Sequence, residues 1–317
     1  MTEPMTDRPI AVLGGGLIGA SWAALFRHHG ADVTVWDPDH EARSQVEARM
    51  AQPLEHLRQL HGAPGRLGKA LVTGDLSEAM TGAVLVQENA PDDAAVKRDL
   101  FAQVEAAADP DAVFASSTSS LTWSELSPGL REPSRLITAH PFNPPHLIPL
   151  VELFGVDDEV VARAEALYAA TRRTTIRLRR DAAGHVANRL ASALWREAVH
   201  IVAEGIADVE AVDAALVNGP GLRWSVAGSH MAYHLGGGLG GLAGYLAHLG
   251  PGQMRRWNDL GAPSLTPEVT AALVAGVEAE ADGRGVQELE AARDAALIAM
   301  LRARRTAGPI EGPRTAS

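Results

Sequence analysis

One stretch decides how the first half of the chain folds: Ile10-Ala-Val-Leu-Gly-Gly-Gly-Leu-Ile-Gly19. An apolar run enters a glycine turn and leaves it as a helix-forming segment. Gly14, Gly16 and Gly19 give the spacing G-x-G-x-x-G. In a strand–turn–helix unit the first glycine makes the tight turn, the second lets the backbone approach a pyrophosphate, and the third lets the helix pack on the strand. The pattern predicts a pyrophosphate site at the helix N-terminus.

An acidic residue follows the glycines at the distance that this motif requires. The segment Asp32–Trp36 reads as a second strand and delivers Asp37 about 20 residues beyond the glycines. A carboxylate there accepts hydrogen bonds from the adenosine ribose and repels a 2′-phosphate, so we predict NAD as the cofactor. The combination of strand, spacing and acid disfavours the alternative, in which Asp37 is a plain turn residue. The predicted cofactor contacts are Gly14, Gly16, Leu17, Ile18, Gly19 and Asp37.

Length and composition exclude several classes of protein. The 317 residues allow two domains, and 46% of them are hydrophobic. The 28 Lys and Arg against 39 Asp and Glu give a net charge of -11, which disfavours nucleic acid or a membrane surface as partner. The chain has no cysteine, which excludes disulfides and thiolate metal sites and fits a reducing compartment. We see neither a signal pattern nor a long apolar run, so we expect a cytoplasmic protein.

Strands and helices alternate beyond Asp37. The further apolar runs are Leu71–Thr73, Ala83–Val86, Ala112–Ala115, Arg135–Ala139, Ile148–Phe154 and Thr174–Arg179. A helix-period stretch runs from Glu41 to Leu60, and we expect Pro53 to interrupt it. The loop between 139 and 148 is too short for a parallel crossover, so its two strands should pair antiparallel. We predict an α/β fold with a Rossmann-type, doubly wound, mostly parallel sheet.

From Gly184 the pattern changes to helices without strands. The expected helices cover 188–204, 209–217, 267–281 and 286–304. We therefore expect an NAD-binding Rossmann domain over 1–181 and an all-helical C-terminal domain over 182–305. The segment 306–317 is rich in Pro, Gly and Thr and is expected to be a disordered tail.

The stretch from His140 to Glu152 carries groups suited to acid–base chemistry. A histidine at a strand end, with a carboxylate from the neighbouring strand, makes an oriented proton acceptor near neutral pH. The serine-rich turn Ser116–Ser120 follows a parallel strand, where open α/β sheets place their ligands. A hydrolase triad of Ser119, His140 and Glu152 is disfavoured, because no G-x-S-x-G elbow exists and the glycine motif would have no role. The other histidines lack metal-ligand spacing, so we predict no metal.

Four motifs together resemble the 3-hydroxyacyl-CoA dehydrogenase superfamily. They are the glycine motif, the serine-rich turn, an H-x-x-N-P segment with a Glu twelve residues after the His, and N-R-L at the start of the helical part. The resemblance covers nearly the whole chain. It implies oxidation of a secondary alcohol at C3 with NAD as hydride acceptor, and it implies a homodimer, because the helical domains of this family pair.

The resemblance also implies roles for individual residues. His140 would be the general base and Glu152 its partner. Ser119 and Asn188 would hydrogen-bond the reacting oxygen, and Asn143 would support the same cluster.

Two further charges match positions that line the cofactor side in the family. They are Glu88 at a strand end and Lys97 on a helix. Lone charges at such places could equally lie at the surface, and this alternative stays open.

The segment Asn218–Ser225 resembles the branch that acts on free hydroxy acids, the L-carnitine and L-gulonate 3-dehydrogenases. Arg223 after a glycine turn is suited to clamp a carboxylate, which a free acid has and a thioester lacks. The alternative is a surface charge at a helix start. Trp224 is one of several aromatic residues available to face a trimethylammonium group.

The sequence departs from its relatives at two turns. Ala183-Gly-His185 stands where the acyl-CoA branch usually has P-G-F, and Pro144-Pro-His146 differs beside His140. We predict oxidation of a small 3-hydroxy acid of the carnitine type. The alternatives are a short-chain 3-hydroxyacyl-CoA dehydrogenase, an L-gulonate 3-dehydrogenase and, in another class, a non-catalytic dinucleotide-binding protein.

Overall fold

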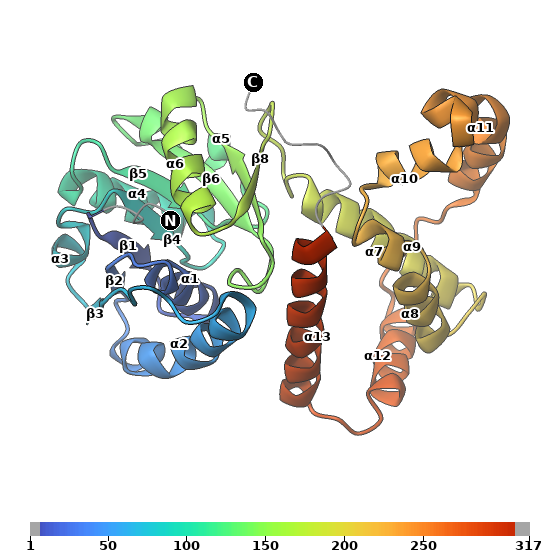
Figure 1. Ribbon diagram of the computed structural model, residues 1–317, viewed down its shortest axis with the longest axis horizontal. Coiled ribbons are helices and arrows are strands. Elements are labelled where there is room, and N and C mark those ends of the chain that lie inside the picture. The colour runs from blue at the N-terminus through green and yellow to red at the C-terminus, as the bar shows by residue number, and fades with distance from the viewer. Residues whose placement is uncertain (1–6, 308–317) are drawn as a thin grey trace. The chain divides into compact units, whose positions relative to one another are not determined.

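The computed structural model describes residues 7–307, which divide into two compact units between Arg189 and Leu190 (Figure 1). The first unit holds an eight-stranded sheet in the order β3-β2-β1-β4-β5-β6-β7-β8. Its strands are β1 (Ile10–Leu13), β2 (Val33–Trp36), β3 (Ala70–Thr73), β4 (Leu85–Glu88), β5 (Val113–Ser116), β6 (Leu136–Pro141), β7 (Leu150–Phe154) and β8 (Thr174–Arg177). All neighbours are parallel except β6 and β7. The predicted fold and the antiparallel pair are confirmed.

Helices cover both faces of this sheet (Figure 1). One face carries α1 (Leu17–His28), α2 (His40–His61) and α6 (Asp158–Ala170), and the other carries α3 (Leu76–Met80), α4 (Ala94–Ala107) and α5 (Trp123–Leu126). A short 3-10 helix, η1 (Pro133–Arg135), precedes β6. In β1, Ile10 and Val12 enter the first core while Ala11 and Leu13 enter the second. Because both faces are buried, the strand reads as a continuous apolar run.

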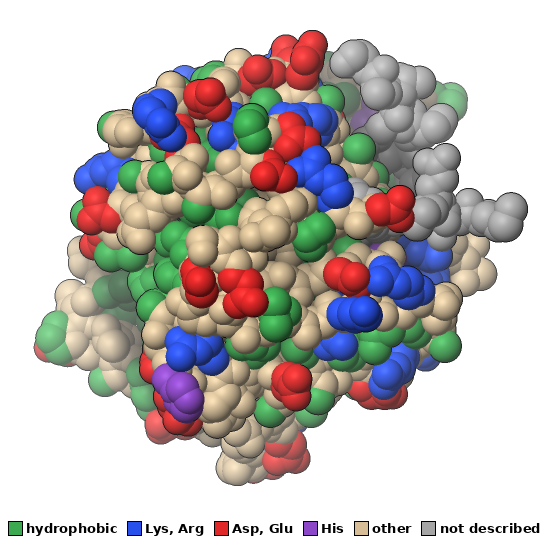
Figure 2. All heavy atoms as spheres, turned by 90° about the vertical axis from the view of Figure 1, so that its left-hand side faces the viewer, with side chains coloured by type: hydrophobic (Ala, Val, Ile, Leu, Met, Phe, Trp, Pro, Cys, Tyr) green, Lys and Arg blue, Asp and Glu red, His purple; other side chains and the backbone are tan. Residues whose placement is uncertain are grey.

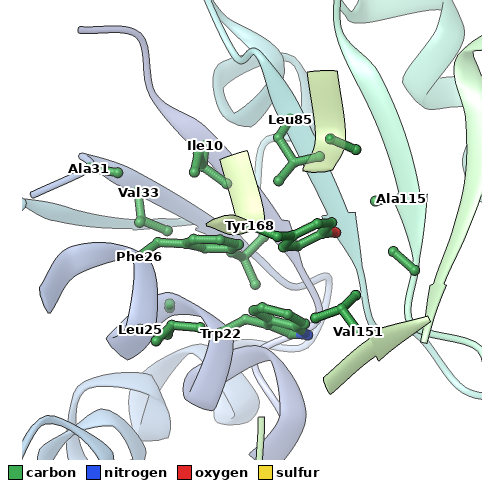
Figure 3. Close-up of a cluster of buried hydrophobic side chains, with 14 of the residues drawn as sticks. Ile10, Trp22, Leu25, Phe26, Ala31, Val33, Leu85, Ala115, Val151 and Tyr168 are labelled. Carbon is green, nitrogen blue, oxygen red and sulfur yellow. The ribbon is translucent and has the colours of Figure 1, made fainter. Parts of the chain in front are cut away.

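Aromatic rings occupy the core beneath α1 (Figure 3). Trp22 stacks on Phe26 at a centroid distance of 5.3 Å and packs against Tyr168 at 5.5 Å. The buried Tyr168 hydroxyl donates to Gln87 Oε1 at 2.6 Å, and burial raises the pKa of Tyr168 above its ordinary value. Trp22 Nε1–H donates to Ser117 Oγ at 3.2 Å. The core is thus hydrogen-bonded to the serine-rich turn that follows β5.

The predicted interruption at Pro53 is wrong. Helix α2 runs unbroken from His40 to His61 with Pro53 inside it. Met50 and Leu57, on either side of the proline, are both buried in the core that α2 shares with α1. Burial of apolar surface on both turns offsets the hydrogen bond that proline removes.

The second unit contains helices and no strands in its described residues, 190–307. Its helices are α7 (Ala187–Ala203), which begins in the first unit, α8 (Val209–Asn218), α9 (Pro220–Trp224), α10 (Ser229–Gly236), η2 (Gly238–Gly240), α11 (Gly241–Asp259), α12 (Pro267–Ala281) and α13 (Val286–Ala307). The sequence predicted none of α9, α10 and α11, because repeated glycines and Pro251 give this region low helix propensity.

Helix α13 extends beyond the predicted end of the helical domain. It includes Thr306 and Ala307, so the predicted disordered tail is wrong for these two residues. The rest of that predicted tail, 308–317, lies outside the described residues.

The surface carries charges of both signs. Figure 2 shows acidic side chains scattered over one side of the molecule with basic side chains between them. The acidic excess of the chain is therefore not gathered in one patch on this side. None of the helices within 7–307 is long and apolar enough to span a bilayer.

Candidate active site

The glycine loop joins β1 to α1 at the carboxyl edge of the sheet. Gly14 has φ +93°, and a Cβ there would lie 2.9 Å from Asn89 O. A Cβ on Gly19 would lie 1.8 Å from Gly14 O, so only glycine allows this close packing. A Cβ on Gly16 would meet nothing within 4 Å, which leaves the backbone open to a ligand. Helix α1 has no side-chain cap and no acidic residue in its first turn, so its N–H groups suit a pyrophosphate.

The other predicted cofactor contacts lie beside this loop. Leu17 and Ile18 form the first turn of α1, and Leu17 is exposed. Asp37 follows β2, and its Oδ2 accepts the Gly15 N–H at 2.7 Å while its Oδ1 accepts the Asp39 N–H at 2.9 Å. Each carboxylate oxygen has a further lone pair, so Asp37 can also accept from ribose hydroxyls. These residues fit an NAD molecule.

His140 and Glu152 are register partners across the antiparallel pair β6 and β7. His140 Nδ1 and Glu152 Oε2 are 2.8 Å apart, and both side chains are buried. Glu152 Oε1 accepts the N–H groups of Val186 and Ala187 at 2.8 and 2.9 Å. Burial by itself would raise the pKa of Glu152, but the hydrogen bonds from His140 and the two amides hold this pKa below its ordinary value. A charged Glu152 keeps the proton of His140 on Nδ1, which leaves Nε2 as a proton acceptor.

Asn188 connects this pair to the serine-rich turn. Its Nδ2 lies 3.3 Å from His140 Nε2 and donates to Ser119 O at 3.1 Å. The start of α7 is thereby fixed to the sheet. For this reason the units divide after Arg189, whereas the change in sequence pattern suggested a boundary at Asp181.

An aspartate that the sequence analysis did not single out holds the serine-rich turn. Asp92 Oδ2 accepts the N–H and the hydroxyl of Ser119 at 3.1 and 2.8 Å, and its Oδ1 accepts the Thr118 hydroxyl at 2.6 Å. Burial would raise the pKa of Asp92, but these hydrogen bonds and the charge of Lys97 hold it below its ordinary value. Asp92 follows β4 at the same sheet edge as the serines, and this position after a parallel strand was the available signal.

Glu88 and Lys97 form a buried ion pair, so the alternative of two surface charges is wrong. Lys97 Nζ lies 2.6 Å from Glu88 Oε1, with the two side chains 1% and 0% exposed. Ser116 Oγ–H donates to Glu88 Oε2 at 2.5 Å, and Lys97 donates to Ala90 O at 2.9 Å. The charged atoms of the pair therefore contact protein groups and join β4, β5 and α4 at the edge of the sheet.

The predicted substrate contacts are divided between the two units, with Asn143 in the first and Arg223 and Trp224 in the second. Asn143 is exposed, and its side chain takes part in none of the hydrogen bonds among residues 7–307. Arg223 and Trp224 lie in α9 of the second unit. Arg223 stands in the last turn of this short helix rather than at a helix start. It is exposed, and no carboxylate of the described chain forms an ion pair with it.

The turn at His146 packs against α1 and α2. His146 is buried, with Nδ1 2.8 Å from Ser21 Oγ and Nε2 3.1 Å from His56 Nδ1. These contacts fasten the loop after His140 to α1 and α2. The departure from the relatives at His146 therefore does not alter an open part of the site.

His185 lies against His140, although the sequence analysis noted it only as a departure in the turn before N-R-L. Its ring lies on the ring of His140, with centroids 4.8 Å apart and an angle of 19° between the planes. The signal was its place in that turn, where the acyl-CoA branch usually has Phe. In the described part of the chain, no group of three or more His, Asp and Glu side chains is arranged to hold a metal ion.

Known proteins resemble this chain along most of its length. The family model for the NAD binding domain of 3-hydroxyacyl-CoA dehydrogenase matches residues 9–182, and the model for the C-terminal domain matches 184–264. The L-carnitine dehydrogenase of Streptomyces coelicolor is 41% identical over 318 residues, which cover 99% of this chain and 100% of that protein. The L-carnitine dehydrogenase of Streptomyces griseus is 43% identical over 304 residues, or 95% and 91% of the two chains.

A solved structure resembles the whole fold. It is 5-formyl-3-hydroxy-2-methylpyridine 4-carboxylic acid 5-dehydrogenase, described as an NAD+-dependent dismutase. The TM-score is 0.79 at 26% identity, covering 96% of this chain and 100% of the other. Both family models match this chain, and the relative from Streptomyces coelicolor is 41% identical along nearly its whole length. This chain therefore belongs to the 3-hydroxyacyl-CoA dehydrogenase family and is an NAD-dependent oxidoreductase.

Proposed function

We propose that this enzyme oxidises the 3-hydroxyl group of a small, free 3-hydroxy acid of the carnitine type to the 3-keto acid. The observation that carries the proposal is the His140–Glu152 hydrogen bond, with Asn188 at the other nitrogen of the imidazole ring. The relatives named L-carnitine dehydrogenase support the substrate class.

The chain's own residues move the proton and hold the oxygen. NAD, when bound, supplies the acceptor for the hydride that leaves C3. His140 Nε2 takes the hydroxyl proton, and the carboxylate of Glu152 stabilises the resulting imidazolium. With substrate bound, the Ser119 hydroxyl, which here donates to Asp92, and the Asn188 amide, which here faces His140 Nε2, turn to donate to the substrate oxygen as it becomes a carbonyl. In reduction of the keto acid, His140 returns the proton.

The cofactor is held, in this proposal, by the glycine loop and the residues beside it. Gly14, Gly16, Leu17, Ile18 and Gly19 surround the pyrophosphate, and Asp37 accepts from the adenosine ribose. The ion pair of Glu88 and Lys97 is buried, so it supports the residues around the cofactor from inside the protein. We assign NAD binding to 1–181, and substrate binding and dimerisation to 182–305, although the compact units divide after Arg189.

Asp37→Ala should weaken the preference for NADH over NADPH by about 10- to 100-fold, because the mutant loses both the ribose acceptor and the charge that repels the 2′-phosphate. Fluorescence titration gives the two dissociation constants. Asp37→Asn keeps an acceptor for the Gly15 N–H and should have an intermediate effect. An unchanged ratio in both variants would remove Asp37 from the ribose site.

A substrate panel tests the proposed activity. Turnover of L-carnitine, L-gulonate, L-3-hydroxybutyrate and 3-hydroxybutyryl-CoA with NAD is followed by NADH absorbance. We expect L-carnitine to give the highest kcat/KM. Turnover of the CoA ester alone would overturn the free-acid proposal in favour of a short-chain 3-hydroxyacyl-CoA dehydrogenase. Preference for L-gulonate would keep the mechanism and change the substrate.

Arg223→Met should raise KM for the free acid about 100-fold, since two charged hydrogen bonds to the carboxylate are lost. The proposal assigns this carboxylate to Arg223, because its guanidinium is exposed and forms no ion pair within 7–307. Trp224 beside it would face the trimethylammonium group, and Asn143 would support the loop of His140. Arg223→Lys keeps the charge without the bidentate geometry and should lose less. An equal rise in KM for the CoA ester would contradict the clamp.

We propose a homodimer formed through the second unit. Large apolar side chains there face solvent, including Trp195 and Trp257 at 56% and 59% exposure. Helices α7, α8 and α12 also form an apolar groove of about 370 Å³, lined by Val199, Val209 and Val274 among others. Such surfaces in a folded protein usually lie against a partner, here a second copy. Light scattering should give twice the chain mass of 33.4 kDa, and a monomer would refute the proposal. We assign the enzyme to the cytoplasm, as the cysteine-free sequence suggests.

A further inference from the structure

His185 covers one face of the proposed acid–base residue. The His185 ring is 1% exposed and lies nearly parallel to the ring of His140, which is 4% exposed. The two ring nitrogens of His140 already face Glu152 and Asn188 in the plane of the ring. A stacked ring makes no hydrogen bond with its neighbour. His185 therefore acts on His140 through packing and charge.

The hydrogen bonds of His185 fix where a second proton would go. Its Nε2 lies 3.2 Å from Thr118 O, which can only accept, so Nε2 carries the hydrogen in the neutral ring. Its Nδ1 is buried without a hydrogen-bond partner among the described residues. Protonation at Nδ1 would create a buried donor without an acceptor, directly beside His140.

The charged groups around His185 come from three elements. His140 lies on β6, Glu152 on β7, and Asp181 in the loop before α7. The Asp181 carboxylate accepts the Trp123 and Ser124 amides at 3.0 and 2.7 Å. Burial and the charge of His140 lower the pKa of His185, against the opposing effects of the Thr118 carbonyl, Glu152 and Asp181. Protonation of His185 is therefore disfavoured while His140 carries a positive charge.

We propose that His185 is a positioning residue for His140 whose own protonation sets the acid limit of keto acid reduction. This inference rests on the proposed role of His140 as acid and base. Reduction requires a proton on His140 and none on Nδ1 of His185. A second proton from solvent places like charges on two stacked rings and displaces His140 from the substrate oxygen. Oxidation requires His140 without a proton on Nε2, so a proton there already stops the reaction. Protonation of His185 therefore has no separate effect on the pH dependence of oxidation.

The backbone at His185 determines which variants test this. Its φ of +49° is left-handed, and the two amides that follow it bond Glu152. Phenylalanine keeps a ring on His140 but cannot titrate. Asparagine tolerates the left-handed backbone and cannot titrate either. The two variants together separate the loss of protonation from loss of the ring or of the turn.

The test compares the pH dependence of both directions in the full-length wild type, His185→Phe and His185→Asn, by NADH absorbance. The wild type should reduce 3-dehydrocarnitine with a bell-shaped profile, its rate falling again on the acid side. Both variants should lose this fall, so that their rate on the acid side, relative to the maximum, is several-fold higher than in the wild type. The acid side of L-carnitine oxidation should be unchanged. Circular dichroism at each pH confirms that the variants are folded.

The outcomes separate this inference from the proposed function. A bell-shaped reduction profile in both variants would overturn the role of His185 and leave His140 untouched. Full activity of His140→Gln would overturn the proposed base instead. Nitrogen-15 NMR of the histidine rings gives a readout that needs no substrate. His185 should take its second proton below the ordinary histidine pKa of 6.5, and protonation of His185 above that value contradicts the inference even if carnitine is not the substrate.

Discussion

His140→Gln is expected to lower kcat for oxidation about 10³-fold, because an amide cannot accept the hydroxyl proton. Oxidation removes one proton from the substrate hydroxyl. The Glu152 hydrogen bond occupies His140 Nδ1, so the lone pair on Nε2 is available to take this proton. Steady-state kinetics with the best substrate of the panel measures the loss. The dissociation constant of NADH should stay within about twofold, because the glycine loop and Asp37 make contacts of their own.

A matched histidine variant controls for this experiment. His230 is exposed on α10, and His230→Gln should keep kcat within about twofold. A His140→Gln enzyme with more than a tenth of the wild-type rate would show that another group takes the proton.

Glu152→Gln should also lower kcat by about 10³-fold, although glutamine has nearly the same shape. Glu152 Oε1 accepts two backbone amides, so a glutamine must turn its carbonyl oxygen toward Val186 and Ala187. Its NH2 group then faces His140 Nδ1 and donates to it. This forces the His140 proton onto Nε2, where the substrate proton should arrive. The variant therefore has a correctly placed ring in the wrong tautomer.

The same variant should change the pH dependence of stability. The pKa of Glu152 is held below its ordinary value of 4.5 in the fold, so its contribution to stability is present above that pH and is lost as the pH falls through the lowered value. Urea unfolding between neutral and acid pH should accordingly depend less on pH in the variant.

Glu159 provides the control carboxylate. It is exposed on α6, and Glu159→Gln should keep the rate and the pH dependence of unfolding within error. If Glu152→Gln loses less than tenfold in kcat, Glu152 does not orient His140, and the proposed pair fails.

Local patterns predicted most of the first unit, because its signals are short in range. The glycine spacing of 14–19, the apolar run of each buried strand and Asp37 after β2 are properties of neighbouring residues. The interruption at Pro53 was predicted wrongly, because local propensity does not include tertiary packing. The burial of Met50 and Leu57 on either side of Pro53 outweighs the local penalty of a proline inside a helix. Helices α9 to α11 were not predicted because their glycines suppress the same local signals.

The predictions for the site divide in the same way, between contacts with a local signal in the sequence and contacts without one. His140 and Glu152 could be paired from sequence because each lies on a predicted strand and an antiparallel register brings residues on either side of a short loop together. Asp92 could not be paired with Ser119, nor His185 with His140, from the sequence. Each of these contacts is made through a loop, and no periodicity in the sequence predicts the course of a loop.

The sequence by itself determined the fold class, the NAD cofactor, the family and the pairing of His140 with Glu152. It could do so because glycine spacing, strand patterning and the order of motifs are written along the chain. Only the tertiary structure decided that Glu152 accepts the amides of Val186 and Ala187, that Glu88 and Lys97 are a buried pair, and that His185 lies on His140. These are contacts between loops and helix ends, where burial and hydrogen bonding in three dimensions, rather than local propensity, fix which side chains meet.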